Sequence, residues 1–259
     1  MLQDEHSQRT LTLTLTRLLA IPGGPLSLLA NGNHLLFLFA YLEGRRALSK
    51  SKAQSKPDLH LVLPSLNAGQ RLQAFADLIA TTRTNLRLLG LFTLYAWLRQ
   101  LMSEGCHCQP IAVYAATLAQ CAAFIVFQSM ENLAFLVDKG VLPLTLVARW
   151  GKDVASVYRM AYRAWLAAIV CGLVRIGAEL SLRSQSLQST SDTSQKCAQQ
   201  RAVNWHEKIR DLCATVGWMP VATHCSLENG LPCFNTGLLG VCGLVADFNA
   251  LQSLWNEAK

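Results

Sequence analysis

The chain has 259 residues, of which 51% are hydrophobic and only 15% are charged, and its formal net charge is +7. Soluble domains usually carry about 25% charged residues, so we expect much of this surface to face something other than water. The basic residues are interleaved with apolar helical stretches and no nucleic-acid-binding motif is present. This pattern argues against nucleic acid as a partner and favours an anionic membrane surface.

The nine cysteines form no disulfide framework, because their number is odd and several fall in apolar stretches (Cys121, Cys171, Cys242). They indicate a reduced protein that faces the cytosol. The only metal-like cluster is Cys106-His107-Cys108, and ligands two residues apart without a second pair are a poor chelate. We therefore expect a plain loop there, with no metal and no cofactor. The first residues lack the pattern of a secretory signal.

The N-terminal region predicts two helices. Residues 10–20 alternate Thr and Leu, which is typical of a strand, but no partner strand is evident and a short helix is favoured. A break at residues 21–25 precedes a second apolar helix over residues 26–42, which the turn-like Asn31-Gly32-Asn33 is expected to interrupt. The basic, Ser-rich residues 44–58 predict a solvated linker, with a patch for anionic lipid as the alternative.

Residues 66–101 predict one or two helices. Arg83 and Arg87 lie one turn apart among Leu86, Leu89, Phe92 and Trp97. A cationic helix that is rich in leucine and aromatic residues fits the interface of a membrane. An ordinary amphipathic core helix has the same pattern, and the residues alone leave both interpretations open.

The run from Ile111 to Trp150 predicts a long, mostly apolar helix that ends at Gly140, with Pro143 preventing continuation. Its polar side chains fall within an arc of about 120°. Glu131 and Asp138 on this stripe form a conceivable acid–base pair, but their amide neighbours indicate a hydrogen-bonded seam against another helix. No catalytic motif is present, and we expect no enzyme. The seam residues are Gln120, Gln128, Glu131 and Asn132.

A second long helix is predicted from Arg149 to Arg183. Its first half carries a basic face and its second half is nearly all apolar, so we expect it to begin at the membrane interface and to end buried or embedded. Residues 184–202 predict a flexible polar loop, and residues 203–216 a modest helix. The members of the basic face are Arg149, Lys152, Arg159 and Arg163.

The C-terminal residues 231–255 carry glycine every third residue, at Gly237, Gly240 and Gly243. These glycines predict a smooth helix face that another helix can approach closely. The uninterrupted apolar core is only about ten residues, which is short of the roughly twenty that a membrane span needs. We nevertheless favour a span or a hairpin insertion for this segment. Together the elements predict an all-α fold in one domain over residues 1–259: a membrane-associated helical bundle with amphipathic interfacial helices and one or two membrane-inserted segments.

Three stretches resemble the peroxisomal biogenesis factor 11 family, in particular its fungal members. They are Arg17–Leu42 (RLLAIPGG, then NHLLFLFAYL), Arg83–Phe92 (RTNLRLLGLF) and Glu131–Trp150 (ENLAFLVDKGVL, then ARW). The glycine-rich C-terminal segment also fits. The sequence departs from the family pattern in its long Ser/Gln/Thr loop and in a C-terminal segment that Asp247 interrupts, and the second departure leaves the number of spans open.

The resemblance implies a peroxisomal membrane protein that elongates the organelle before fission by a dynamin-like GTPase and that self-associates. Arg83–Phe92 falls where the family carries an amphipathic helix that bends membranes. We hypothesise that Arg83 and Arg87 contact anionic phospholipid headgroups and that the basic face of the second long helix does the same. Polar seams and small-residue faces would then support a homo-oligomer.

Two other functions remain open from the sequence. Polar stripes on apolar helices also suit a membrane pore or solute channel. A soluble helical adaptor would bury all of its apolar faces internally.

Overall fold

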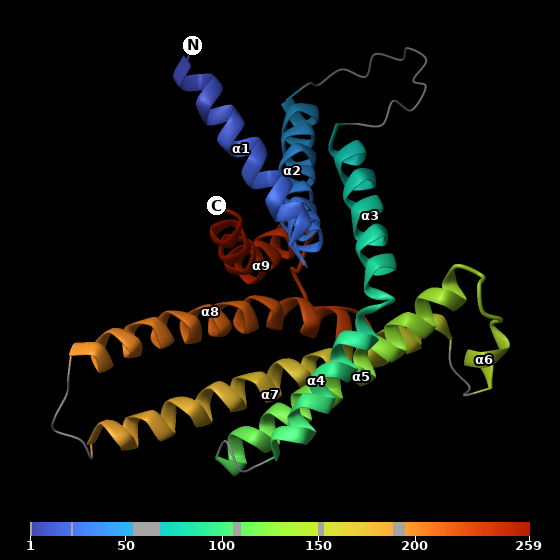
Figure 1. The fold of residues 1–259 in the computed structure, drawn as a ribbon. Coiled ribbons are helices and arrows are strands. Elements are labelled where there is room, and N and C mark those ends of the chain that lie inside the picture. The colour runs from blue at the N-terminus through green and yellow to red at the C-terminus, as the bar shows by residue number, and fades with distance from the viewer. Residues whose placement is uncertain (1, 22, 54–67, 106–109, 150–152, 189–194) are drawn as a thin grey trace, which may run out of the picture. The chain divides into compact units, whose positions relative to one another are not determined.

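A computed structural model describes residues 2–21, 23–53, 68–105, 110–149, 153–188 and 195–259. Within these ranges every regular element is a helix, and the predicted all-α, membrane-associated class is confirmed. The helices are α1 (Leu2–Ala20), α2 (Gly24–Ala53), α3 (Ala68–Arg87), α4 (Gly90–Glu104), α5 (Ile111–Asp138), α6 (Thr145–Ala148), α7 (Val154–Gln188), α8 (Gln195–Ser226) and α9 (Thr236–Ala258) (Figure 1).

The chain divides into two compact units, which we describe separately. Unit 1 comprises residues 1–86 and 233–259, and unit 2 comprises residues 87–232. Unit 1 is therefore made from both ends of the sequence: α2 packs along α9, and α1 contacts both. The N-terminal end of α3 also approaches α2, since a side chain on Gly69 would meet the backbone of Ala40 and Gly44. Whether the whole chain behaves as one domain stays a prediction.

Unit 2 is built on α5 and α7, which pack along each other, with α4 against α5 and α8 against α7. An aromatic cluster joins α5, α7 and α8: Phe127 stacks on Trp165 with ring centroids 5.7 Å apart, and Trp165 packs on Trp218 at 5.4 Å. A second apolar cluster lies where α5 ends and α7 begins, around Ala134, Val137, Val147 and Val157. Ala134 and Val137 lie one turn apart on α5, Val147 is on α6 and Val157 is on α7, so the burial of this cluster holds the three helices together.

The end of α5 forms the turn that the sequence predicts. Gly140 has a φ of +71°. Its N–H donates to Val137, and the N–H of Val141 donates to Leu136 at 2.9 Å, which is the paired bonding of a Schellman motif. Pro143 lies just beyond. The turn thus satisfies the last carbonyl groups of α5 and directs the chain into α6.

Gly140→Ala is expected to lower the free energy of unfolding by about 1–2 kcal/mol, because only glycine adopts a positive φ without steric cost. No atom lies within 4 Å of the added methyl group, so the effect comes from the backbone alone. Denaturant unfolding of the purified protein measures it. Gly177→Ala on α7, which also has open space at its Cβ and has no positive φ, is the control and should be neutral or stabilising.

The second long helix begins later than the sequence predicts, at Val154 instead of Arg149. The carboxylate of Asp153 accepts from the N–H and the hydroxyl of Ser156, which caps the first turn of α7. The hydrogen bond from the Ser156 side chain lowers the pKa of Asp153. Arg149 instead follows the short helix α6, and Lys152 lies outside the described residues. The predicted four-residue basic face on one helix is therefore wrong.

Several predicted breaks are helical in the structure. The helix α2 runs through Asn31-Gly32-Asn33 without interruption and continues to Ala53, so most of the basic segment 44–58 is helix; residues 54–58 lie outside the described ranges. The predicted loop over residues 184–202 is helical up to Gln188 and again from Gln195. The stretch from Arg83 to Phe92 belongs to two helices, since α3 ends at Arg87 and α4 begins at Gly90.

Three described helices are long and apolar enough to cross a membrane. They are α5, the part of α7 over Val154–Leu182, and α9. The bent pair α1–α2 passes the same test only when its two arms are taken together. The sequence led us to expect one or two inserted segments, whereas length and composition allow three, or four if the bent pair is one span.

Candidate functional site

The predicted polar seam of α5 is a connected hydrogen-bond network in unit 2. Gln128 donates to Asn132 at 2.7 Å and lies 3.5 Å from Glu131. Asn132 in turn donates to the carbonyl of Leu88, in the break between α3 and α4, at 3.2 Å. All three side chains are buried. The seam therefore holds the residue that precedes α4 against α5.

Arg87 completes this network with a charge. Its guanidinium lies 3.0 Å from the carboxylate of Glu131, whose side chain is only 4% exposed. A buried carboxylate needs such a partner, because taking an unpaired charge out of water is costly. The geometry gives Arg87 a structural role at the α3–α4 break. Contact with lipid headgroups stays a prediction for this residue.

A second charged cluster lies in unit 1, between α2, α3 and α9. His34, which is 4% exposed, lies 3.2 Å from the carboxylate of Asp247, and Arg83 approaches the same carboxylate at 3.9 Å. Asn31 donates to the Asp247 carbonyl at 3.3 Å. Asp247, which interrupts the apolar C-terminal segment in the sequence, is thus surrounded by polar groups. Arg83, like Arg87, has a carboxylate beside it, and its contact with lipid also stays a prediction.

The three glycines of α9 face α2. A side chain on Gly237 would meet the ring of Tyr41, and one on Gly243 would meet the imidazole of His34. On Gly240 the obstacle is backbone, because a Cβ would lie 2.7 Å from the carbonyl oxygen of His34. The glycine face of α9 therefore packs against α2 of the same chain. In unit 2, Gln120 uses a similar close approach, with its amide against Gly172 of α7.

Two of the predicted basic residues lie on α7 and reach the end of α8 and the loop after it. Arg163 donates from Nε to the carbonyl of Ser226 at 3.2 Å. Arg159 donates to Ser156 and lies 3.9 Å from the exposed carboxylate of Glu228. A guanidinium at the last carbonyls of a helix is favourable for the helix dipole. Arg163 is exposed as well, which leaves it accessible to a negatively charged surface.

Both α3 and α4 carry rows of exposed large apolar side chains. On α3 the row is Phe75, Leu78 and Leu86, at positions that repeat on one helix face. On α4 and just before it, the row contains Leu89, Phe92, Tyr95 and Met102, and Phe92 is 74% exposed. Rows of this kind are unusual in contact with water and are typical of helices that lie in a membrane interface.

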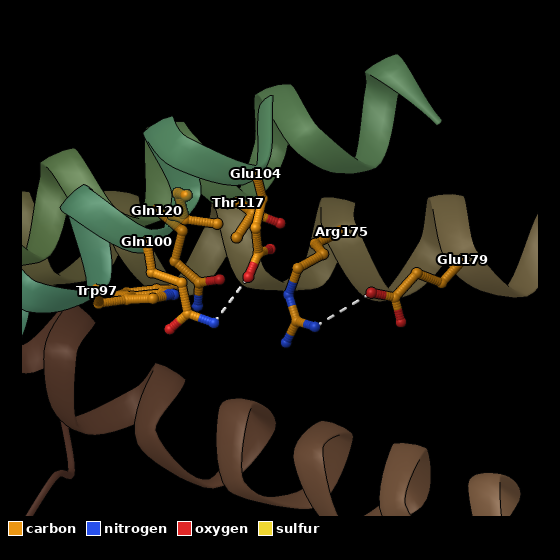
Figure 2. A pocket seen from close by; sticks show the side chains of 8 residues that line it. Trp97, Gln100, Glu104, Thr117, Gln120, Arg175 and Glu179 are labelled. Atoms are coloured by element: carbon orange, nitrogen blue, oxygen red, sulfur yellow. Dashed lines mark hydrogen bonds and ion pairs between the residues drawn. The ribbon is translucent and has the colours of Figure 1, made fainter. Parts of the chain in front are cut away.

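A pocket of about 390 Å³ opens between α4, α5 and α7 in unit 2 (Figure 2). Its walls are mostly polar. Gln100 donates to Glu104 at 2.8 Å, and Arg175 donates to Glu179 at 3.2 Å. Glu104, Arg175 and Glu179 are not among the candidate residues that the sequence predicted. The remaining lining residues are Trp97, Leu101, Thr117 and Gln120.

The described residues contain no group of three potential metal ligands, and the Cys106–Cys108 cluster lies outside them. The paired carboxylates that catalysis would need are also not on a common surface, since Glu131 is buried against Arg87 whereas Asp138 is exposed beside Lys139. Burial raises the pKa of the Cys225 thiol, which disfavours the reactive thiolate. The arrangement therefore favours packing and membrane contact over chemistry.

The sequence did not reveal the pairing of His34 with Asp247, because the two residues are 213 positions apart. The same holds for Arg83 and Asp247, which come from α3 and α9. The only sequence feature that pointed to such a pairing was the apolar stretch in which each of these residues lies. A charged or polar side chain in a stretch that is otherwise apolar needs a partner, whose identity only the fold supplies.

The helices, their apolar faces and the buried polar seams define a helical membrane-associated protein. A model of the family described as peroxisomal biogenesis factor 11 (PEX11) matches residues 60–255, which is well over half of the chain. The chain belongs to this family, and the resemblance noted in the sequence is confirmed. It is therefore a peroxisome biogenesis protein that associates with peroxisomes. No curated protein and no solved structure matches the chain significantly.

Proposed function

We propose that this protein remodels and elongates the peroxisomal membrane during peroxisome division, and so controls the number and size of peroxisomes. The observation that carries the proposal is the pair of exposed apolar rows on α3 and α4, which include Phe75, Leu78, Phe92 and Tyr95. Side chains of this kind insert into the outer part of one leaflet. Their volume expands that leaflet relative to the other, and the membrane curves.

The buried network of unit 2 supports this function because it attaches the start of α4, which carries one of the two apolar rows, to α5. The hydrogen bond from Asn132 to Leu88 and the ion pair between Arg87 and Glu131 hold the residues just before α4 against α5. A bilayer that is bent by an inserted helix pushes back on that helix. The helix therefore needs a firm attachment to the membrane-embedded helices. The hydrophobic helices α5, α7 and α9 supply the anchor in this proposal.

The proposed partners are an anionic phospholipid membrane, further copies of the chain and a dynamin-like fission GTPase. The net charge of +7 and the exposed Arg163 support binding to anionic lipid. A row of exposed apolar side chains on α9 supports self-association, because its spacing of three and four residues is that of a helix–helix seam. The members of this row are Leu238, Val241, Val245 and Phe248.

The double substitution Leu89→Asp and Phe92→Asp is expected to abolish the conversion of liposomes into tubules by the purified protein. Each change puts a charge where the proposal places acyl chains, at a cost of about 2–3 kcal/mol per residue on the scale of membrane insertion. Electron microscopy of liposomes that contain anionic phospholipid measures the outcome. In cells that lack the gene, the same variant should fail to restore elongated peroxisomes.

Thr93→Asp is the matched control. It adds the same charge to the first turn of α4 at an exposed position outside the apolar row, where an acidic residue suits the helix dipole. If the double variant forms tubules as well as the control does, insertion of the α4 row is not what curves the membrane. Arg83→Glu and Arg87→Glu are less informative, because each reversal would place two carboxylates together and disturb the fold.

A membrane pore or solute channel is the second candidate function. The polar pocket between α4, α5 and α7 favours it, whereas the hydrogen bonds among Gln128, Glu131 and Asn132 leave that seam closed. Conductance of purified protein in planar bilayers would support the pore. A silent bilayer together with tubulated liposomes would support remodelling alone.

A further inference from the structure

We propose that the pocket between α4, α5 and α7 binds a neutral cyclic polyol, such as the ring of a sugar. This assignment does not depend on membrane remodelling. It rests on the polar helix faces that line the pocket, on the pairing of its charged side chains and on the indole in its wall (Figure 2).

The lining of the pocket comes from three helices of unit 2. On each helix the polar lining residues are spaced by three or four positions, so they lie on one face. A ligand that replaces water beside such walls has to return the hydrogen bonds that water made, and it therefore carries many polar groups. The residues are Trp97, Gln100 and Glu104 on α4, Thr117 and Gln120 on α5, and Arg175 and Glu179 on α7.

The ion pairs of the pocket favour a ligand without charge. Arg175 lies 3.2 Å from Glu179 and 3.6 Å from Asp211, and Lys208 pairs with Glu179. In this group two cations and two carboxylates balance each other. A charged ligand would compete with these pairs, because each charge already has an opposite charge beside it.

Hydroxyl groups can bind here while these contacts stay in place. A carboxylate has about four acceptor sites and a guanidinium has several N–H donors, so each keeps its partner and still bonds a hydroxyl. Gln100 donates to Glu104 at 2.8 Å, which uses one of its two amide hydrogens. Thr117 donates to the carbonyl of Val113 at 2.8 Å, so its oxygen is left to accept. The walls thus offer donors and acceptors together, and a hydroxyl group matches both.

The indole of Trp97 favours a ring over an open chain. Figure 2 shows it beside the side-chain amides of Gln100 and Gln120. An aromatic face packs against the C–H groups of a rigid ring, while the polar groups around it bind the hydroxyls. Gly172 of α7 leaves room for the Gln120 amide, since a Cβ there would lie 2.8 Å from Nε2. The volume of about 390 Å³ is that of a small-ligand site.

The position of the pocket allows two sources for the ring. Thr117 and Gln120 lie within the first ten residues of α5, and Arg175 and Glu179 lie in the second half of α7. If α5 and α7 cross the membrane, these positions approach one interface, where lipid headgroups lie. The ring is then the headgroup of a neutral glycolipid. A free sugar presents the same hydroxyls and is the other source.

The first experiment uses the full-length protein in a polyoxyethylene detergent, which carries no sugar. Glucose and myo-inositol are titrated by saturation-transfer difference NMR, which detects weak binding. Sorbitol, glucose 6-phosphate and choline are the comparisons, because they are an open-chain polyol, an anion and a cation. We expect the two neutral rings to bind and each comparison to bind at least about fivefold more weakly. Failure of both rings to bind, or a comparison that binds as strongly as glucose, would overturn the proposal.

Native mass spectrometry of protein extracted from membranes in the same detergent identifies the source of the ring. A retained hexosyl lipid that is lost in Gln120→Met assigns the site to a glycolipid headgroup. Glucose binding without a retained lipid assigns it to a free sugar. Both results support a site for a neutral cyclic polyol.

Substitutions test the residues of the pocket. Trp97→Leu removes the aromatic face and Gln120→Met removes the amide, and each should weaken glucose binding about fivefold or more. Tyr95→Leu and Gln73→Met remove an exposed ring and an exposed amide outside the pocket, and they should leave binding unchanged. Trp97→Phe should retain most of the binding, which separates recognition from misfolding if Trp97→Leu loses helical content by circular dichroism. Unchanged binding in both Trp97→Leu and Gln120→Met would overturn the assignment of the site.

Discussion

Arg87→Ala is expected to lower the free energy of unfolding by about 3 kcal/mol, because it leaves the buried carboxylate of Glu131 without its cation. We take the lower end of the range for broken buried ion pairs, since the Arg87 side chain is 34% exposed and water reaches it. Loss of the charge should also loosen the α3–α4 break, where Asn132 holds the Leu88 carbonyl. Denaturant unfolding in detergent, followed by circular dichroism, measures the change.

Two controls separate the ion pair from a general loss of a surface side chain. Lys139→Ala removes a half-exposed partner of Asp138 and should cost no more than about 1 kcal/mol. The double variant Arg87→Met and Glu131→Leu removes both charges and should recover much of the stability that Arg87→Ala loses. A double variant as unstable as Arg87→Ala would mean that the seam depends on packing around these residues and not on the pair.

The second large effect is expected at Gly240. Gly240→Ala should destabilise the protein by about 1–3 kcal/mol, and Gly240→Leu by more, because the new Cβ meets backbone atoms of α2 that cannot rotate away. These atoms are the carbonyl oxygen of His34 at 2.7 Å and the amide nitrogen of Leu38 at 3.0 Å. The two helices have to separate, which also opens the His34–Asp247 contact.

The control for Gly240 has the opposite expected sign. Gly32 lies inside α2 with nothing within 4 Å of its Cβ position, so Gly32→Ala should stabilise the helix by about 1 kcal/mol. Unfolding curves of both variants under the same conditions measure the difference. Stabilisation by Gly240→Ala as well would show that α9 and α2 do not pack as closely as the structure indicates.

Local signals in the sequence predicted those features of the fold that depend on neighbouring residues. The course of α5 and the turn at Gly140 follow from apolar periodicity and from the need for a residue with positive φ. The α9 glycines predicted a close approach for the same kind of reason. Each of these signals lies within a few residues of the feature that it predicts.

The features that the sequence did not predict depend on distant residues. Asn31 and Asn33 resemble a turn, yet both are buried in α2, where the Asn31 amide bonds Ser27 and the carbonyl of Asp247, 216 positions away. Tertiary contacts of this kind override the low helix propensity of asparagine. Arg83 and Arg87 likewise looked available for lipid, because nothing nearby in the sequence revealed the carboxylates of Asp247 and Glu131.

The construction of unit 1 from both ends of the chain has a consequence for synthesis. When α2 leaves the ribosome, the glycine face that covers it lies more than 180 residues ahead, since α2 ends at Ala53 and α9 begins at Thr236. At ordinary rates of translation this interval lasts on the order of ten seconds or more. During that time α2, with its buried histidine and two buried asparagines, lacks α9, the helix against which it packs most extensively. A chaperone or a membrane surface has to protect it, and the packing of α2 against α9 can form only once α9 has left the ribosome.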